Sequence, residues 1–295
     1  MSKQQQPFVH LHVHSEFSLL DGLSRIGDLV SRAVELNQPA IALTDHGAMY
    51  GTMPFYRAAK KAGVKPIIGI ESYLSMRDMQ QRDPQKDKER YHMLLLAQNQ
   101  AGYSNLLQLA SAAQLEGYYY KPRIDRAFMA QYSDGLIATT GCMAGEIPRA
   151  IGQGNMTLAH ELMAEYVDIF GRERLFVELQ EHHIPELRDI NKKLLEMAPR
   201  YGLENNFLAT NDVHYTRAED AKPHEVLLCI QTSSTVNNPK MTFSDTEYFL
   251  KSYDEMAALF GEVPGALDNS LRIAEMCDVS LDWQGYHLPE FELPE

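Results

Sequence analysis

Long apolar runs are missing from this sequence. No segment of the 295-residue chain approaches the roughly 18 consecutive apolar residues that a membrane-spanning helix requires. The N-terminal segment MSKQQQP also lacks the apolar core of a signal peptide. We therefore expect a cytoplasmic protein with no membrane partner.

Cysteine and basic residues are also scarce. Cys142, Cys229 and Cys277 are an odd number of cysteines at wide spacing, which argues against a disulfide framework and for a reducing compartment. The formal net charge is −13, whereas proteins that hold nucleic acid usually have an excess of Lys and Arg. This charge counts against tight independent binding of DNA, unless bound cations neutralise acidic side chains or a basic surface lies elsewhere in a longer polypeptide.

Short runs rich in Val, Ile and Leu alternate with segments of 3.6-residue periodicity, which is the pattern of β/α units. Candidate strands lie at 8–14, 39–45, 66–74, 91–98, 135–140, 174–180 and 206–211. Candidate helices lie at 25–37, 52–62, 103–116, 143–171 with a break near Gly152 and Gly154, and 186–200. Seven strands with helices between them favour a closed or nearly closed α/β barrel over an open doubly wound sheet.

Residues 75–90 interrupt this alternation. They are highly charged and almost free of apolar side chains, which predicts an exposed loop rather than a crossover helix. Strands joined without a crossover usually pair antiparallel, so the end of 66–74 should lie beside the start of 91–98.

The pattern becomes helical after residue 215, with candidate helices at 217–233, 252–260 and 264–277, and the chain ends in LPEFELPE. We expect one domain over 1–285, in which the barrel extends to about residue 215 and a helical extension follows it. Residues 286–295 are expected to form a tail.

Three histidines alternate in the first apolar run. In a strand, His12 and His14 project to the same side about 6.6 Å apart, so the pair can bind one divalent cation. The same alternation also fits an ordinary half-exposed strand. His10 lies nearer the start of the run, and we expect it to pack in the core or to support the ligands.

Further side chains of metal-binding type occur in or just after the other candidate strands: Asp21, His46, Glu71, His92, Cys142, Asp212 and His214. A carboxylate such as Glu71 inside an apolar run costs several kcal/mol unless a cation, an ion pair or hydrogen bonds compensate for it. Nine such groups exceed what one ion binds and suit two or three metals. The mixture of imidazole, carboxylate and thiolate favours zinc, with manganese or iron where carboxylates dominate.

Several long motifs resemble those of a known family. They are FVHLHVHSEFSLLDGL, ALTDHGAMYG, KPIIGIE, YHMLLLAQNQAGYSNL, YYYKPRID, GCMAGEIP, ATNDVHY and HEVLLCIQT. Together they make the whole chain similar to the polymerase and histidinol phosphatase (PHP) domain at the N-terminus of bacterial DNA polymerase III alpha subunits. The resemblance implies a distorted, TIM-like barrel of seven strands with a centre of three divalent metal ions.

The resemblance also implies a role for each ligand. His12, His14, Glu71 and Asp212 would surround one metal, Glu71 would bridge to a second metal held by His92 and Cys142, and Asp21, His46 and His214 would hold the third. In many alpha subunits of the family some ligands are replaced, and the domain is thought to be a metal-free structural module. This sequence keeps all nine ligands. It lacks the palm, fingers and thumb, so we expect no polymerase activity from it.

The complete ligand set leads to the hypothesis of a metal-dependent phosphodiesterase, a 3′–5′ exonuclease that acts on a DNA 3′ end and proofreads for polymerase modules of the same polypeptide. A hydroxide held between metals would attack phosphorus in line, with Glu71 and Asp212 as central ligands. The alternatives are a phosphomonoesterase that acts on a small phosphate ester and a metal-stabilised, non-catalytic scaffold for the polymerase.

Candidate substrate contacts are fewer. Lys121, Arg123 and the basic residues of 77–90 could hold a nucleic acid backbone, and the neighbouring tyrosines of YYYKPR could stack bases. The alternative is that these side chains are solvated loop residues without a ligand. Glu178, Gln180 and His182 alternate out of the sixth candidate strand, so they are candidates to line the pocket, with His182 as a substrate contact.

Overall fold

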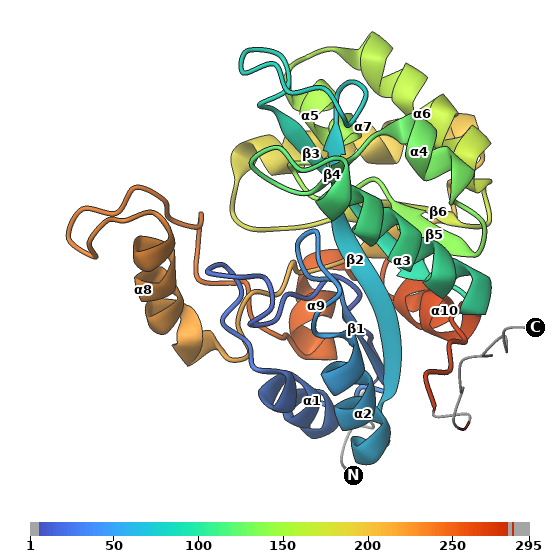
Figure 1. Ribbon diagram of the computed structural model, residues 1–295. Helices are drawn as coiled ribbons and strands as arrows, with labels where there is room; N and C mark the ends of the chain where they lie inside the picture. Colours follow the sequence, from blue (N-terminus) through green and yellow to red (C-terminus); the bar gives the residue numbers. More distant parts are fainter. Residues whose placement is uncertain (1–5, 283–284, 286–295) are drawn as a thin grey trace, which may run out of the picture.

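A curled mixed β-sheet wrapped by helices forms the body of the protein in the computed structural model, which describes residues 6–282 and residue 285 (Figure 1). The sheet order is β1-β2-β3-β5-β6-β7, with β4 paired to β2. The strands are β1 (Ala40–Leu43), β2 (Lys65–Ser75), β3 (Arg90–Ala97), β4 (Arg123–Ile124), β5 (Leu136–Thr139), β6 (Leu175–Leu179) and β7 (Phe207–Ala209). The predicted α/β fold, a distorted TIM-like barrel of seven strands, is confirmed in the form of a curled mixed sheet of seven strands.

The helices follow the predicted periodicity closely. They are α1 (Ile26–Glu35), α2 (Thr52–Ala62), α3 (Gln100–Leu115), α4 (Arg126–Gln131), α5 (Glu146–Gly152), α6 (Met156–Phe170), α7 (Pro185–Met197), α8 (Ala221–Gln231), α9 (Tyr253–Phe260) and α10 (Asp268–Met276), with short 3-10 turns at Ala198–Tyr201 and Ala218–Asp220. The predicted break is confirmed between α5 and α6, where Gly154 has a φ of +75° and Asn155 caps α6. The short β4 and α4 were not predicted.

The charged loop 75–90 joins an antiparallel pair, as predicted. Ser75 is paired with Arg90 and Leu74 with Tyr91, and β3 is also antiparallel to β5. Because β3 runs against the other strands, its first residues lie at the rim where those strands end. This reversal brings His92 to the carboxyl ends of the parallel strands.

The first segment, 8–14, corrects a prediction because it forms only an isolated bridge, between Val13 and Val213, rather than a full strand. Its backbone is bonded on both sides: Ala42 N donates to His10 O at 2.9 Å, and His14 N donates to Val213 O at 2.7 Å. A hydroxyl replaces a regular ladder partner, since Val13 N donates to the side chain of Thr44. The segment therefore lies between β1 and the chain after β7 and connects the two edges of the curled sheet.

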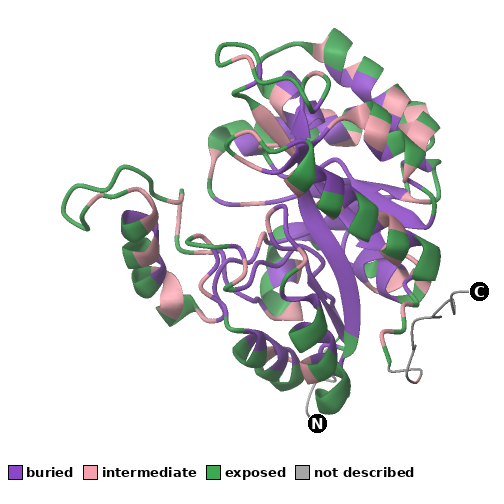
Figure 2. Ribbon diagram, in the orientation of Figure 1, coloured by how far each residue is buried: buried purple, intermediate pink, exposed green. Residues whose placement is uncertain are grey.

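The inner face of the sheet is layered along the strands. Near the strand starts it is apolar and packs against α10; this layer includes Ala40, Ala42, Ile67, Ile137, Phe176, Leu208, Ile273 and Cys277. Alternate residues share a face, so the same face continues through Glu71, Thr139, Glu178 and Thr210, which are all buried. Figure 2 shows the strands buried along almost their whole length. One end of the sheet is thus filled by apolar residues, and the other end presents polar side chains.

The helical extension after residue 215 is also present. In Figure 1, α8 stands away from the sheet, whereas α10 lies against it. Among the described residues, no helix is long and apolar enough to cross a membrane. The predicted tail over 286–295 lies outside the described residues, and the division of the chain at residue 285 stays a prediction.

Candidate metal centre

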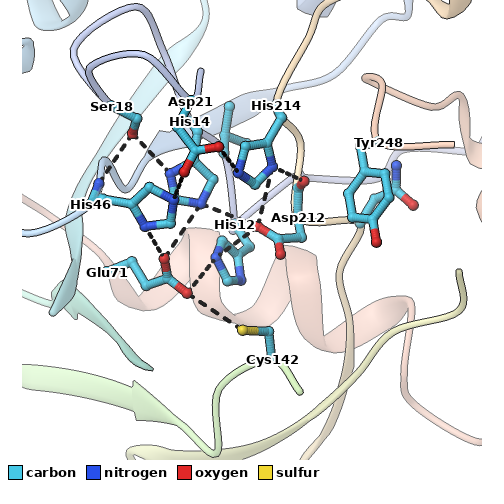
Figure 3. A network of polar contacts seen from close by, with 12 residues as sticks. His12, His14, Ser18, Asp21, His46, Glu71, Cys142, Asp212, His214 and Tyr248 are labelled. Atoms are coloured by element: carbon cyan, nitrogen blue, oxygen red, sulfur yellow. Dashed lines mark hydrogen bonds and ion pairs between the residues drawn. The ribbon is translucent and has the colours of Figure 1, made fainter. Parts of the chain in front are cut away.

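The nine predicted ligands lie together at the polar rim of the sheet, most of them drawn in Figure 3. They come from segment 8–14 and its following loop (His12, His14, Asp21), from the segment after β1 (His46), from the middle of β2 (Glu71), from the start of β3 (His92), and from the segments after β5 and β7 (Cys142, Asp212, His214). The sequence predicted that nearly all of these residues lie at one rim, and the structure brings the nine side chains together there. Their role as metal ligands stays a prediction.

Glu71 lies at the middle of the cluster and is 1% exposed. Its Oε1 is 2.9 Å from His92 Nδ1 and 3.3 Å from His12 Nε2, and its Oε2 is 2.5 Å from His46 Nδ1. The Sγ of Cys142 is 3.6 Å from Oε1. Burial alone would raise the pKa of Glu71, but the surrounding imidazoles outweigh it and hold the pKa well below its usual range. The carboxylate is therefore anionic and has contacts with most of the cluster.

Asp212 joins the two histidines of the first segment. Its Oδ1 is 3.1 Å from the Nε2 atoms of both His12 and His14. Burial acts to raise the pKa of Asp212, but His12 and His214 lower it by more. The residue has a φ of +46°, a left-handed conformation that Asp and Asn adopt more readily than most residues. This backbone conformation turns the chain after β7 so that Asp212 and His214 both lie at the rim.

Hydrogen bonds fix which nitrogen of His14 carries a proton. The Ser18 hydroxyl donates to Asp45 Oδ1 at 2.7 Å, so Ser18 Oγ accepts from His14 Nδ1 at 3.0 Å. The Nε2 atom of the neutral ring then presents its lone pair to Asp212. Burial, followed by the neighbouring His46 and His214, lowers the pKa of His14 to about 3. A neutral imidazole with one free nitrogen is the form that binds metals.

His12 and His214 are held in the same way. His12 Nδ1 donates to Glu178 Oε1 at 2.7 Å, and His214 Nδ1 donates to the backbone oxygen of Asp212 at 2.7 Å. A carboxylate or carbonyl on Nδ1 is the usual support of a metal-binding histidine. In both rings the Nε2 atom is directed toward the acidic cluster.

Buried polar atoms without a hydrogen-bond partner test whether these residues fit metal ions. Among the described residues of the cluster, they are His12 Nε2, Asp21 Oδ1, His46 Nδ1 and Glu71 Oε2. A lone pair that faces an anionic oxygen is unfavourable, and leaving buried polar atoms unpaired costs free energy. A divalent cation between these atoms removes both costs. The residues therefore fit bound divalent metals.

Three groups of side chains place their ligand atoms within 4.8 Å of one another: His12, His14 and Glu71; His46, Glu71 and His92; and His14, His46 and His214. The first group matches part of the first predicted metal site, and Glu71 belongs to two groups, as expected of a bridging ligand. The prediction differs at His46, which also lies with Glu71 and His92. Cys142 Sγ lies 3.7 Å from His92 Nδ1, beside this second group.

Two supporting acids follow from the structure. Asp45, next to a predicted ligand in sequence, accepts from Ser15 N at 2.7 Å and from Ser18, so it shapes the loop after the first segment. Glu178 supports His12 and also accepts from Thr210 at 2.6 Å. The alternation of Glu178 with Gln180 at the end of a strand pointed to the pocket, but no sequence pattern indicated that segment 8–14 lies opposite. His10 is outside the cluster: it is fully buried, and its Nε2 donates to Lys251 O.

Arg123 corrects a predicted substrate contact. Its side chain is 1% exposed and donates to the backbone oxygens of Gly117, Asp87, Met79 and Gln81. Loop 75–90 and the turn before β4 wrap around the guanidinium group, so its donors are committed to the backbone. Arg123 is a structural residue that holds the charged loop in place.

The other two predicted substrate contacts lie near the cluster. Lys121 Nζ is 5.5 Å from the centroid of the Tyr73 ring, and Tyr73 stacks on His46. His182 is buried and stacks on Tyr248 with ring centroids 3.8 Å apart. Their contact with a substrate stays a prediction.

Two cavities meet at the cluster. The larger, of about 460 Å³, is lined by Asp21, His46, His92, Cys142, Asp212 and His214 together with His182, Phe243, Tyr248 and several aliphatic side chains. The smaller, of about 240 Å³, is lined by Asp21 and His46 together with Tyr73, Tyr118 and Lys121. Asp21 and His46 therefore line both cavities.

Comparison with known proteins defines the class. The PHP domain family matches residues 10–182, and the chain belongs to this family. It is 44% identical over 299 residues to a DNA polymerase III subunit alpha of Thermus aquaticus, an alignment that covers 98% of this chain and 24% of that protein. It is 41% identical over 290 residues to the same subunit of Borreliella burgdorferi, with 97% and 25% covered.

The chain thus spans about a quarter of the length of these relatives. Among solved structures, an amidohydrolase from Chromobacterium violaceum is similar with a TM-score of 0.42 and 17% identity, and the match covers 70% of this chain and 87% of that one.

Proposed function

We propose that this chain is a metal-dependent phosphoesterase that acts as a 3′–5′ exonuclease on DNA. The observation that carries the proposal is the cluster of nine ligand-type side chains, in which four buried nitrogen and oxygen atoms lack a hydrogen-bond partner among the described residues. The relatives are named DNA polymerase III subunit alpha, which supports a DNA 3′ end as the substrate and polymerase modules of the same polypeptide as partners.

Three divalent ions, zinc or manganese with iron as a further option, would supply Lewis acidity and water of lowered pKa. The residues proposed to hold them are the nine of the cluster, with Glu71 as the bridging ligand. Glu178 and Ser18 keep protons on the Nδ1 atoms of His12 and His14. Both rings are thereby oriented with Nε2 toward the reacting centre.

The arrangement of the cavities favours a phosphodiester over a phosphomonoester. A phosphodiester extends from phosphorus in two directions, whereas a monoester extends in one. Asp21 and His46 line both cavities, so a phosphate bound beside them has space for a substituent on each side. The phosphomonoesterase hypothesis requires only one of these spaces.

The experiment is cleavage of a 5′-labelled single-stranded oligonucleotide with manganese or zinc present. We expect shortening from the 3′ end, one nucleotide at a time. Asp212→Asn keeps the size and the left-handed backbone of Asp212 and should reduce the rate at least about 100-fold. Asp134→Asn is the matched control, because the Asp134 side chain is 90% exposed and remote from the ligand set.

The outcomes separate the three hypotheses. Hydrolysis of p-nitrophenyl phosphate without cleavage of DNA would establish a phosphomonoesterase instead. Thermal stabilisation by metal without hydrolysis of either substrate would establish a scaffold. Equal rates for Asp212→Asn and wild type would show that the cleavage comes from a contaminating nuclease.

A further inference from the structure

The two cavities beside the cluster differ in charge. Among the described residues that line the larger cavity, none is Lys or Arg. The smaller cavity contains Lys121. Phosphate groups bind where cations gather, so the two cavities suit different parts of a nucleic acid strand.

The larger cavity has an aromatic wall that reaches the candidate metal ligands. His182 and Tyr248 stack with centroids 3.8 Å apart and planes at 4°. The centroid of the Phe243 ring lies 4.4 Å from that of Tyr248 and 4.8 Å from that of His214, and the ring is edge to face with each. These three rings line the cavity, and stacking on aromatic rings is how proteins hold single-stranded bases.

His182 lacks a hydrogen-bond partner in this wall. Its side chain is 2% exposed, and neither ring nitrogen has a partner among the described residues. Asp245 Oδ1 is 3.8 Å from Nδ1, beyond hydrogen-bond distance, while Asp245 Oδ2 bonds to His183 at 2.8 Å. Leaving a buried imidazole unpaired costs free energy. A nucleobase has donors and acceptors along its edge, so a base in this cavity is a suitable partner for His182.

The smaller cavity has the opposite character. Lys121 Nζ lies 5.5 Å and the Arg90 guanidinium 5.7 Å from the centroid of the Tyr73 ring. Tyr73 in turn stacks on His46 with centroids 5.9 Å apart. Tyr118, which lines the same cavity, is 50% exposed. Two cations and the exposed Tyr118 ring beside the cluster form a surface for a strand that carries several phosphates.

We propose that the base of the 3′-terminal nucleotide binds in the cavity of His182, Phe243 and Tyr248, and that the preceding nucleotides lie on the Lys121 side. This assignment rests on the proposed exonuclease function and adds the direction in which the DNA strand lies across the cluster. The scissile phosphate would lie beside Asp21 and His46, which are shared by both cavities. His182 is then a substrate-binding residue that discriminates an intact terminal base from a missing one.

The test compares oligonucleotides that end in thymidine or in an abasic residue. Stacking and hydrogen bonding to one base should make wild type prefer the thymidine end in kcat/KM by about 10-fold. His182→Ala should remove most of this preference. Wild type should bind a decamer more tightly than a dinucleotide, and Lys121→Gln should reduce this difference in affinity. The control is Lys61→Gln, on the exposed side of α2, which should leave the difference unchanged.

A binding measurement makes the test independent of turnover. An oligonucleotide with 2-aminopurine at its 3′ end should lose fluorescence on binding wild type, and should lose much less on binding His182→Ala. Equal cleavage of the two ends by wild type, or quenching only when 2-aminopurine is internal, would overturn the assignment. If wild type cleaves neither end, the exonuclease proposal fails, and the fluorescence result shows separately whether the base site exists.

Discussion

Two buried polar regions of this protein differ in how completely their atoms are paired. The Arg123 guanidinium group donates to the backbone oxygens of Gly117, Asp87, Met79 and Gln81, and it is fully enclosed. In the cluster around Glu71, the side chains of His12, His14 and Glu71 are equally buried, yet several nitrogen and oxygen atoms of the cluster face one another without a hydrogen-bond partner among the described residues. Paired groups of the first kind hold a fold together. Unpaired groups of the second kind remain available for a ligand.

The largest change in stability is expected when the paired region is broken. Arg123→Met removes the donor from four backbone oxygens, three of them in buried hydrogen bonds, and it should lower the free energy of unfolding by about 3–5 kcal/mol. Urea unfolding followed by circular dichroism measures this. Arg57→Met, at an exposed position of α2, should change the free energy by no more than about 0.5 kcal/mol. Similar values for the two variants would contradict the structural role of Arg123.

Removal of bound metal should destabilise the protein through the cluster around Glu71. Occupied sites stabilise the folded state by mass action, so chelation with EDTA should lower the melting temperature of wild type by roughly 5–10 °C. Asp212→Asn, which removes a carboxylate between His12 and His14, should show a smaller shift. An unchanged melting temperature in EDTA, after prior loading with zinc or manganese, would argue against bound metal.

A smaller effect is expected at Glu178, which supports a predicted metal ligand without being one itself. Glu178→Gln keeps the shape of the side chain that supports His12 but removes its charge, and it should weaken metal affinity about 10- to 100-fold. Competition with a coloured chelator measures the affinity. Glu173→Gln is the control, because the Glu173 side chain is 89% exposed. Equal affinities would show that Glu178 has no part in orienting His12.

The smallest effect concerns a paired acid outside the cluster. Burial raises the pKa of Glu146 above 4.5, although Arg126 and Tyr166 oppose this by hydrogen bonding. The folded state then holds the proton more tightly than the unfolded state, so this residue makes stability fall as pH rises from about 4.5 through the raised pKa. Glu146→Gln should flatten that part of the stability curve. Urea midpoints measured between pH 4 and pH 7 for both proteins decide it, and parallel curves would contradict the shift.

Much of the cluster followed from the sequence because its ligands are tied to strand ends. In an α/β sheet the carboxyl ends of parallel strands meet at one rim, so His46 and Asp212 could be placed together without coordinates. His92 required the charge pattern of loop 75–90, which predicted the reversed strand. The periodicity of a sequence does not show which segments pair when they lie far apart in the chain. The segment 8–14 has alternating residues but bonds to side-chain hydroxyls, and a short run of residues cannot reveal such partners.

Arg123 also shows that a sequence does not reveal contacts between distant segments. Its neighbours in YYYKPR are three tyrosines, a lysine and a proline, and this composition fits both a nucleic acid contact and a loop residue. Burial of the side chain depends on how loop 75–90, more than 30 residues earlier in the chain, passes over it. Only the three-dimensional arrangement separates a cation that binds the backbone of its own chain from one that is free to bind a ligand.

The most direct test of the central claim is the metal content of the purified chain. After incubation with zinc or manganese and removal of free ions, plasma mass spectrometry should find about three ions per wild-type chain, in line with the ligand number. Asp212→Asn should retain fewer, because it weakens the ligand set around His12 and His14. Wild-type protein that retains no more metal than this variant, under conditions where both are folded, would contradict the account.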